Sequence, residues 1–494
     1  MAVSAEQAVV VLDKLVEELR KRQNDSGATC PGVDTLTKAY DGEFKLRYAS
    51  DSFKDYFATR YQHFSDNWCG IVGDAPHERL EPVGIRLRGE EKGDGGLWAS
   101  WTDQDADAYC DLALLDAIVA KRSFAQVWGE DGKISWGHPS QMIVGYDPAT
   151  RERVSGAFVW RDGDMEFASL DWAGYLWKFQ RPVNEELERA GFIMPPGYDS
   201  LGWRPRQESS DDTWPIENPM GRVSFVEIPN RPKLVGEPRS DIAGTLAMQH
   251  AINLLWAQLF AVSDEATIGQ RVVIGAEMPV IPILNAEGEV IGERKVDLRK
   301  LRQDDIAWIT DPNAKIAEWK PAALDVFTNV IEIAVGHIAA QTRTPAHYLL
   351  IGGTIANVSG DAMKALETGL VKRTEEKTQH FGRSIRDIFE MVALAGNDTG
   401  KAQAIRGGKV LWKDVENRSD AQRADALAKK RDIGYPLQYL LELDGLPPHE
   451  IERVMAMLRE EQTDPILSRI MRPTQQPEKP GATSGDNGDA GLGD

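Results

Sequence analysis

Residues 321–394 predict two long amphipathic helices joined by a glycine-containing break, and this arrangement constrains the chain more than any other stretch. Pro345 cannot continue the first helix, and Gly396 with Asn397 ends the second. The break, residues 344–360, presents backbone, methyl groups and one histidine where a catalytic loop would present nucleophiles, acids or bases. We therefore expect this segment to touch another molecule without reacting with it.

Apolar residues at helical spacing support both helices. Pro321 suits the first turn of the first helix, and Ser359 suits the N-cap of the second, with Asp361 in its first turn. The first stripe consists of Phe327, Val330, Ile331, Ala334 and Ile338, and the second of Leu366, Leu370, Phe381, Ile385, Ile388 and Phe389.

Composition excludes some classes of protein. The 494 residues are enough for about three domains. With 42% hydrophobic and 27% charged residues, the chain has the balance of a folded soluble protein. The net charge of −20 disfavours a compact module that grips duplex nucleic acid through a basic face. Cys30, Cys69 and Cys110 form no CxxC pair, so we expect three reduced thiols in a reducing cytoplasm.

The sequence predicts neither a signal peptide nor a membrane span. Residues 1–22 place apolar side chains at helical spacing among Glu and Lys, which indicates an amphipathic helix. The longest apolar stretch, residues 251–262, is too short and too polar to cross a bilayer. Residues 473–494 contain almost no apolar side chains, and we expect them to be disordered.

The first 235 residues show a mixed pattern. Helical periodicity covers residues 4–20, 51–72 and 103–121. Strand-like segments separated by Asp-Gly and Asp-Pro turn signals follow at residues 123–127, 143–146, 157–160 and 175–179.

Tryptophan is dense in this region, and two interpretations compete. Aromatic side chains dominate cores and subunit interfaces by buried area, which favours packing. The alternative is a platform for carbohydrate or base stacking. The residues concerned are Trp68, Trp98, Trp101, Trp128, Trp136, Trp160, Trp172, Trp177, Trp203 and Trp214.

The rest of the chain alternates linker, helix and strand signals. Residues 229–238 read as an extended, proline-punctuated linker, and Ser240-Asp241 is expected to cap a helix that runs to Ser263 and is buried on more than one side. Residues 266–319 predict a small β-rich excursion, with strands at 272–274 and 280–284 and a turn at 285–288. Residues 420–471 are helical, with Ile451, Val454, Met455 and Leu458 on one face.

Motifs of enzymatic chemistry are missing. The stretch 396–402 resembles a phosphate loop, but it is one residue short and lacks the Ser/Thr that would bind Mg²⁺. No HExxH or GxSxG occurs, and His337 and His347 have a spacing with no metal-binding logic. Gly352-Gly353 lacks the GxGxxG order and a preceding strand. We therefore predict no catalytic residue, no metal site and no cofactor.

The order of these parts, over about residues 35–470, resembles the portal proteins of tailed bacteriophages, most closely the type of actinobacterial phages. Pro447-Pro448 departs from the pattern, because a Ser-type cap is expected there. The stretches that carry the resemblance are Tyr40-Asp41-Gly42, Leu46-Arg47-Tyr48, Asn67-Trp68-Cys69, Arg79-Leu80, Val144-Gly145-Tyr146-Asp147-Pro148, Glu227-Ile228-Pro229-Asn230-Arg231-Pro232, Thr344-Pro345, Ser359-Gly360-Asp361-Ala362 and Trp412-Lys413-Asp414.

The resemblance implies an α+β portal-like fold with no enzymatic activity. Its expected parts are an N-terminal mixed α/β wing (1–235), a stem helix (236–265), a β-rich clip (266–319), a second stem helix (320–343), a tunnel loop (344–359), a long wing helix with the C-terminal wing part (360–420), a helical crown (421–472) and the tail (473–494).

The resemblance also implies a homo-oligomeric ring, usually a dodecamer, at one capsid vertex of the virion, assembled in the host cytoplasm. Its partners would be double-stranded DNA bound without sequence preference, the major capsid protein, the terminase and then the head–tail connector, with no membrane. The acidic chain and the apolar loop favour DNA that slides through the ring over DNA that is bound tightly by it. The residues expected to face DNA are Leu350, Ile351, Gly352, Gly353, Thr354, Ile355, Ala356 and Asn357.

Arg343, at the end of the first helix, has two alternative roles: contact with a DNA phosphate, or capping of helix carbonyls. Two rival functions also stay open. One is an enzyme that uses the Trp-rich region on polysaccharide, which would need a pair of carboxylates in a cleft. The other is an adaptor that binds one protein partner without forming a channel.

Overall fold

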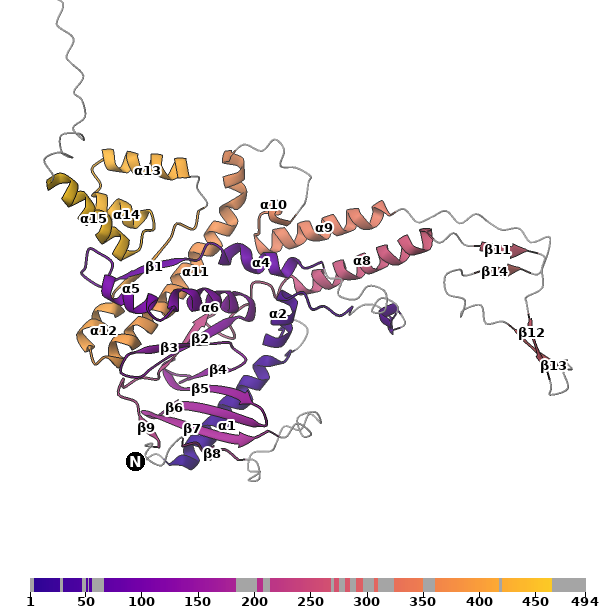
Figure 1. The fold of residues 1–494 in the computed structure, drawn as a ribbon, viewed down its shortest axis with the longest axis horizontal. Helices are drawn as coiled ribbons and strands as arrows, with labels where there is room; N and C mark the ends of the chain where they lie inside the picture. Colours follow the sequence, from indigo (N-terminus) through magenta and orange to yellow (C-terminus); the bar gives the residue numbers. More distant parts are fainter. Residues whose placement is uncertain are drawn as a thin grey trace, which may run out of the picture.

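A computed structural model of the chain shows an α+β protein (Figure 1). The residues that it describes are 4–26, 30–46, 50–51, 53–55, 66–183, 202–207, 214–267, 271–274, 280–284, 290–295, 306–309, 324–349, 360–416 and 420–463. Several expectations therefore lie outside the described residues: the loop at 350–357, the N-cap Ser359, Pro321, the turn at 285–288 and the tail 473–494.

The N-terminal helix α1 (Ala5–Gln23) confirms the predicted amphipathic helix. It begins with a capping box in which the Ser4 and Gln7 side chains each accept a hydrogen bond from the other residue's backbone N–H. Its buried residues, among them Leu12 and Val16, pack against Ala157 and Trp177 of the largest sheet. Burial of this stripe seats α1 on one face of that sheet (Figure 1).

The largest sheet is an antiparallel arrangement in the order β4-β5-β6-β7-β8, with β9 also paired to β7. Three of its strands confirm predicted segments, although β6 between them was not predicted. The bounds are β4 Met142–Tyr146, β5 Arg153–Asp162, β6 Met165–Trp172, β7 Tyr175–Pro182, β8 Arg204–Pro205 and β9 Ile216–Glu217.

A second, three-stranded sheet in the order β10-β2-β3 lies under two helices of the central core. Strand β2 (Arg122–Trp128) confirms the predicted segment, and it pairs with β3 (Lys133–Gly137) and β10 (Phe225–Pro229). Helix α6 (Ala106–Ala120) and helix α11 (Gly360–Ala395) bury Leu114, Ile118, Phe381, Ile385 and Phe389 in the cluster that the sheet completes.

All ten tryptophans of the N-terminal region are buried or half-buried. Trp98 and Trp101 stack with ring centroids 6.1 Å apart in the central core, and Trp177 lies beneath α1. The packing interpretation is confirmed, because none of these rings is freely displayed for a sugar or a base.

Three further helices and one strand of the N-terminal half complete this region. Helix α2 is Val33–Tyr40, α4 is Trp68–His77 and α5 is Gly95–Thr102. Strand β1 (Pro82–Arg86) pairs antiparallel with β15 (Lys409–Trp412), which joins the N-terminal region to the segment that follows α12. Residues 51 and 53–55 are helical and α4 begins at Trp68, so the described residues at both ends of the predicted helix 51–72 are helical, except for residues 66–67 just before α4. Part of the predicted span lies outside the described residues.

Helices α8 (Leu246–Thr267) and α9 (Asp325–Thr342) lie side by side and project from the body (Figure 1). Their bases pack into one cluster with α2 and α4, which includes Ile252, Ile331 and Ile338. The expected cap at Ser240-Asp241 is wrong: α8 begins six residues later than Ser240, at Leu246, because Asp241 is engaged elsewhere. Burial on several sides of α8 is confirmed, since Gln249, His250 and Asn253 are buried as well as Ile252.

The β-rich excursion between these helices is confirmed. Strand β11 (Arg271–Ile274) pairs in parallel with β14 (Ile306–Ile309), and β12 (Val280–Leu284) pairs antiparallel with β13 (Val290–Lys295). Figure 1 draws these strands beyond the far ends of α8 and α9.

The long helix α11 ends at Ala395, and Asn397 adopts a left-handed φ of 58° after it. The predicted end at Gly396-Asn397 is therefore confirmed. Two predicted stripe residues are corrected: Val330 of α9 is 43% exposed and Leu366 of α11 is 53% exposed. Val330 lies off the buried face of α9, whereas Leu366 shares the helix face of Leu370 but precedes the part of α11 that packs against the core.

The C-terminal helices are α12 (Thr399–Arg406), α13 (Asp420–Asp432), α14 (Leu437–Leu443) and α15 (Pro448–Thr463). Ile451, Val454, Met455 and Leu458 lie on the buried or half-buried face of α15, as predicted. Pro448 starts this helix and packs against Gly84 and Gly93, which explains a proline where a cap residue was expected. Within the described ranges, no helix has the length and apolarity needed to span a bilayer.

Candidate functional site

The predicted contact loop runs between two described segments. The short helix α10 (Ala346–Leu349) precedes it and α11 follows it. Leu350, Ile351, Gly352, Gly353, Thr354, Ile355, Ala356 and Asn357 lie outside the described residues, so the structure informs us about the site through its flanks. These flanks are α9, Arg343, α10 and the first turns of α11.

Arg343 follows the last residue of α9 in a left-handed conformation with φ 56° and is exposed. Its guanidinium has no hydrogen-bond or ion-pair partner among the residues that the structure describes. The carbonyl of Thr342, at the C-terminus of α9, accepts a hydrogen bond from Nη1 of Arg373 on α11. Capping of this carbonyl therefore falls to Arg373, and the Arg343 side chain remains available for another contact.

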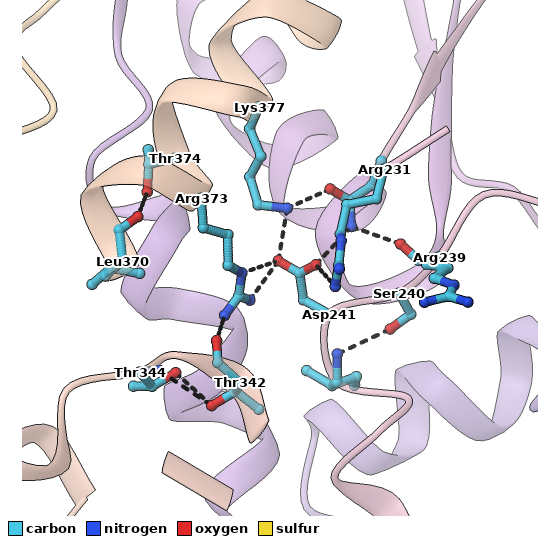
Figure 2. A network of polar contacts seen from close by, with 12 residues as sticks. Arg231, Arg239, Ser240, Asp241, Thr342, Thr344, Leu370, Arg373, Thr374 and Lys377 are labelled. Atoms are coloured by element: carbon cyan, nitrogen blue, oxygen red, sulfur yellow. Dashed lines mark hydrogen bonds and ion pairs between the residues drawn. The ribbon is translucent and has the colours of Figure 1, made fainter. Parts of the chain in front are cut away.

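Asp241 is the centre of a buried polar junction (Figure 2). Its Oδ2 atom lies 2.6 Å from Nη2 of Arg373 and 2.7 Å from Nζ of Lys377. Its Oδ1 atom accepts a hydrogen bond of 3.2 Å from Nδ2 of Asn230 and lies 3.7 Å from Nη1 of Arg231. The carboxylate is completely buried, and the Lys377 side chain is 1% exposed.

This junction ties together three parts of the chain. Asn230, Arg231 and Asp241 belong to the linker ahead of α8, and Arg373 and Lys377 belong to α11. Arg373 also donates to the end of α9, and Lys377 Nζ donates to Oδ1 of Asn230. Helix α11 is thereby fixed against the roots of both projecting helices.

The electrostatics of the junction are set by one carboxylate among several cations. Burial by itself raises the pKa of Asp241, but Lys377 and Arg373 outweigh this and hold it well below its usual range. Burial lowers the pKa of Lys377 to about 8, although Asp241 opposes the shift. The positive charges of the junction outnumber its single carboxylate. The negative end of the α9 helix dipole lies beside Arg373 and partly balances this excess positive charge.

A second polar cluster, the Arg79 clasp, lies nearer to the loop. We define it as Arg79, His347, Tyr348 and Glu367. Nη2 of Arg79 donates to Oη of Tyr348 at 2.7 Å and to Oε2 of Glu367 at 3.3 Å. Oη of Tyr348 donates to Oε1 of Glu367 at 3.4 Å, and Nε2 of His347 lies 3.7 Å from the same oxygen.

Three of the residues that could have suggested an enzyme, Asp398, Lys401 and His347, make structural contacts. In the near-miss phosphate loop, Asp398 caps α12 by accepting from the Lys401 N–H, and Lys401 Nζ lies 3.4 Å from Asp94. His347 belongs to the Arg79 clasp and His337 is exposed on α9. Among the described residues, no group of three or more His, Cys, Asp or Glu side chains is arranged to hold a metal ion.

The sequence interpretation missed both polar clusters, although a signal for one was present. Arg373 and Lys377 occupy positions of the α11 stripe, between Leu370 and Phe381, where apolar residues are expected. Charged residues at stripe positions indicate a buried ion pair, but their partner cannot be located from helical periodicity. Arg79 carries no comparable signal.

Comparison with known proteins decides the family. Residues 80–464 match the family described as phage portal protein, SPP1 Gp6-like. The chain belongs to this family of phage portal proteins. The match includes the whole α8–α9 projection, the loop and α11, and it agrees with the resemblance drawn from the order of the parts. The family is a structural, non-enzymatic one, so the polysaccharide-enzyme alternative gains no support.

Two mycobacteriophage proteins are similar to this portal protein over most of their length. The portal protein of Mycobacterium phage L5 is 24% identical over 444 residues, which are 84% of this chain and 86% of the phage L5 protein. The portal protein of Mycobacterium phage D29 is 24% identical over 391 residues, which are 74% of this chain and 75% of the D29 protein.

Solved structures with a looser likeness come from gene transfer agent particles. One, described as the neck of an empty particle, has a TM-score of 0.40 and 11% identity, and the likeness covers 84% of this portal protein and 94% of that chain. Another, from the virion of a native particle, has a TM-score of 0.37 and 10% identity, with 90% and 100% covered. Family membership rests on the sequence match and not on these scores.

Proposed function

We propose that this portal protein assembles into a closed ring, with twelve copies as in the family pattern, at one vertex of a phage capsid. Double-stranded DNA passes through the ring during packaging and ejection, and the ring docks the terminase and then the head–tail connector. It contacts the major capsid protein and is built in the host cytoplasm. Support comes from the family match over residues 80–464 and from the surface of α9 described next.

The observation that carries the proposal is an exposed apolar stripe on α9. Val326, Val330 and Ile333 are 60%, 43% and 62% exposed, and they recur at the spacing of one helix face. Ile331 and Ile338, on another face of the same helix, are buried at its root. A projecting helix with apolar side chains on two faces favours packing against a second copy of itself around a ring.

In this ring, residues 1–235 and 360–420 make the wing, 236–265 and 320–343 the stem, 266–319 the clip and 421–472 the crown. Residues 344–359 are the tunnel loop, with Leu350, Ile351, Gly352, Gly353, Thr354, Ile355, Ala356 and Asn357 toward DNA. The guanidinium of Arg343 beside this loop is exposed and has no partner among the described residues, which supports a phosphate contact. A net charge of −20 per chain favours sliding of the DNA through the channel rather than tight binding of the DNA.

The test introduces a charge into the stripe. Ile333→Glu should prevent or weaken ring formation, because a carboxylate would be buried between neighbouring stems without a partner. Thr328→Glu is the matched control, since it adds the same charge at an exposed position on another face of α9. Size-exclusion chromatography with light scattering reports the mass, and negative-stain microscopy reports closed rings.

Wild-type protein that stays monomeric at micromolar concentration would contradict the ring. If Ile333→Glu still forms unchanged rings, the α9 stripe does not lie in the subunit interface.

A further inference from the structure

Helix α11 changes its surroundings at Leu370. From residue 364 to residue 369 no side chain is buried, and Leu366 is 53% exposed. From Leu370 onward the stripe that includes Phe381 and Ile385 is completely buried. Figure 1 shows this first part of α11 extending beyond α4. Apolar packing therefore holds the helix from Leu370 onward and contributes little ahead of it.

What holds the part ahead of Leu370 is the Arg79 clasp. The Arg79 side chain is 9% exposed and that of Glu367 is 15% exposed, so this ion pair is shielded from solvent. The same guanidinium donates through Nη1 to the carbonyl of Val415 at 3.1 Å, in the chain that follows β15. Arg79 itself follows α4, so one residue of the wing joins α10, α11 and the segment after β15.

The placement of these contacts along the chain is informative. Tyr348 lies in α10, just before residues 350–359, and Glu367 lies in α11, just after them. Nη2 of Arg79 contacts both residues, so one arginine links the segment before residues 350–359 to the segment after them. A guanidinium presents several donors in one rigid plane, whereas a lysine ammonium is a point charge on a flexible stem. The geometry therefore requires arginine in particular.

The clasp is the weaker of the two polar anchors of α11. At the junction, Asp241 is completely buried and accepts contacts of 2.6 Å and 2.7 Å from two cations. In the clasp, Glu367 receives contacts of 3.3, 3.4 and 3.7 Å, and Nδ1 of His347 is buried without a hydrogen-bond partner in the part of the chain that the structure describes. Local opening follows the least stable contacts of a fold, so the clasp is expected to open before the junction.

We propose that Arg79 is a positioning residue that holds α10 and the first turns of α11 against the wing, while the Asp241 junction and the core hold the remainder of α11 independently. Opening of the clasp loosens the first turns of α11 and releases Tyr348 of α10, while Leu349 of α10 stays packed in the core cluster of α4 and α9. Its consequence for DNA rests on the proposed function, but the structural claim does not.

Hydrogen–deuterium exchange of the full-length protein, without DNA, tests the structural claim. Arg79→Met keeps the aliphatic length and removes the donors. It should speed exchange in residues 346–349 and 360–369 by about tenfold, as expected for loss of hydrogen bonds that involve charged groups. Exchange in residues 373–395 should not change. Tyr348→Phe, which removes one hydroxyl, should act in the same direction by a smaller factor.

Lys413→Met is the matched control, because it removes a cation from an exposed pair with Glu81, at 2.7 Å, without touching α10 or α11. It should leave exchange in both regions unchanged. Arg79→Lys should resemble Arg79→Met, since an ammonium cannot reach the three acceptors together.

The proposal is overturned if Arg79→Met leaves residues 346–349 and 360–369 as protected as in the wild type. It is also overturned if exchange rises equally through residue 395, which would mean general destabilisation. A DNA-packaging assay on the same variants reports separately on the proposed function, because the exchange measurement involves no DNA.

Discussion

The Nζ atom of Lys377 lies 2.7 Å from the Oδ2 atom of Asp241, and neither side chain is more than 1% exposed. Asp241 precedes α8 and Lys377 lies within α11, so the contact joins the root of the projecting helices to the helix that follows the loop. A buried charge is tolerated only with a partner in good geometry. The pair therefore restricts α11 to one position against the roots of α8 and α9.

Asp241→Asn should destabilise the protein strongly. The substitution preserves shape but leaves Arg373 and Lys377 buried without a counter-charge, which costs about 3–5 kcal/mol when one partner of a buried pair is removed. Thermal and urea unfolding midpoints of the variant and the wild type measure the loss.

Glu450→Gln is the control for this loss, because its pair with Arg453 is exposed, at 3.3 Å, and such pairs contribute about 1 kcal/mol or less. Equal shifts of the unfolding midpoints in the two variants would show that the buried junction contributes no more to stability than an exposed ion pair.

The contribution of Asp241 to the free energy of unfolding should decrease as the pH falls. Burial raises its pKa, but Lys377 and Arg373 outweigh burial and hold the pKa well below its usual range in the folded state. The unfolded carboxyl titrates near a pKa of about 3.9. The stabilisation is therefore complete above about pH 5 and is lost as the pH falls through the folded pKa.

We expect the stability gap between the wild type and Asp241→Asn to be smaller below about pH 4 than at about pH 5, because only the wild-type carboxyl becomes protonated over that range. Melting temperatures of both proteins across an acidic series measure this gap. A gap of constant size throughout the series would show that the charge of Asp241 does not act in the folded state.

Arg343→Gly should separate stability from contact with DNA. Arg343 has a φ of 56°, which costs an L-residue about 1–2 kcal/mol and costs glycine almost nothing. The melting temperature should therefore stay the same or rise. If Arg343 contacts phosphate, DNA binding by assembled rings should weaken and its salt dependence should become less steep. Arg343→Lys, which keeps the charge, should retain the salt slope, and an unchanged slope in the glycine variant would refute the contact.

Gly93→Ala should loosen the C-terminal helices without unfolding the core. A Cβ atom at residue 93 would lie 2.6 Å from Cγ of Pro448, which is closer than such atoms approach, so the start of α15 must move. Limited proteolysis should cleave residues 420–463 faster, with an unchanged melting temperature of the core. Gly96→Ala is the control, because the nearest atom to its Cβ is 3.5 Å away. Equal proteolysis of both variants would contradict the contact with Pro448.

Several parts of the fold and of the candidate site could be predicted because they depend on local pattern. The amphipathic stripe of α1, the pairs of β-rich segments between α8 and α9, and the end of α11 at Gly396-Asn397 follow from side-chain period and turn chemistry. The start of α8 could not be predicted, because the cap chemistry of Ser240-Asp241 lost to an ion pair with a distant helix.

The sequence by itself determined the order of the elements, the long helix after the loop and the membership of a portal family, since these depend on local periodicity and on the succession of motifs. Only the tertiary structure decided that Asp241 meets Lys377 and that Arg79 spans from Tyr348 to Glu367. The physical reason is that a charged side chain can pair with any opposite charge within reach. Which one it meets depends on where the packed core places the backbones.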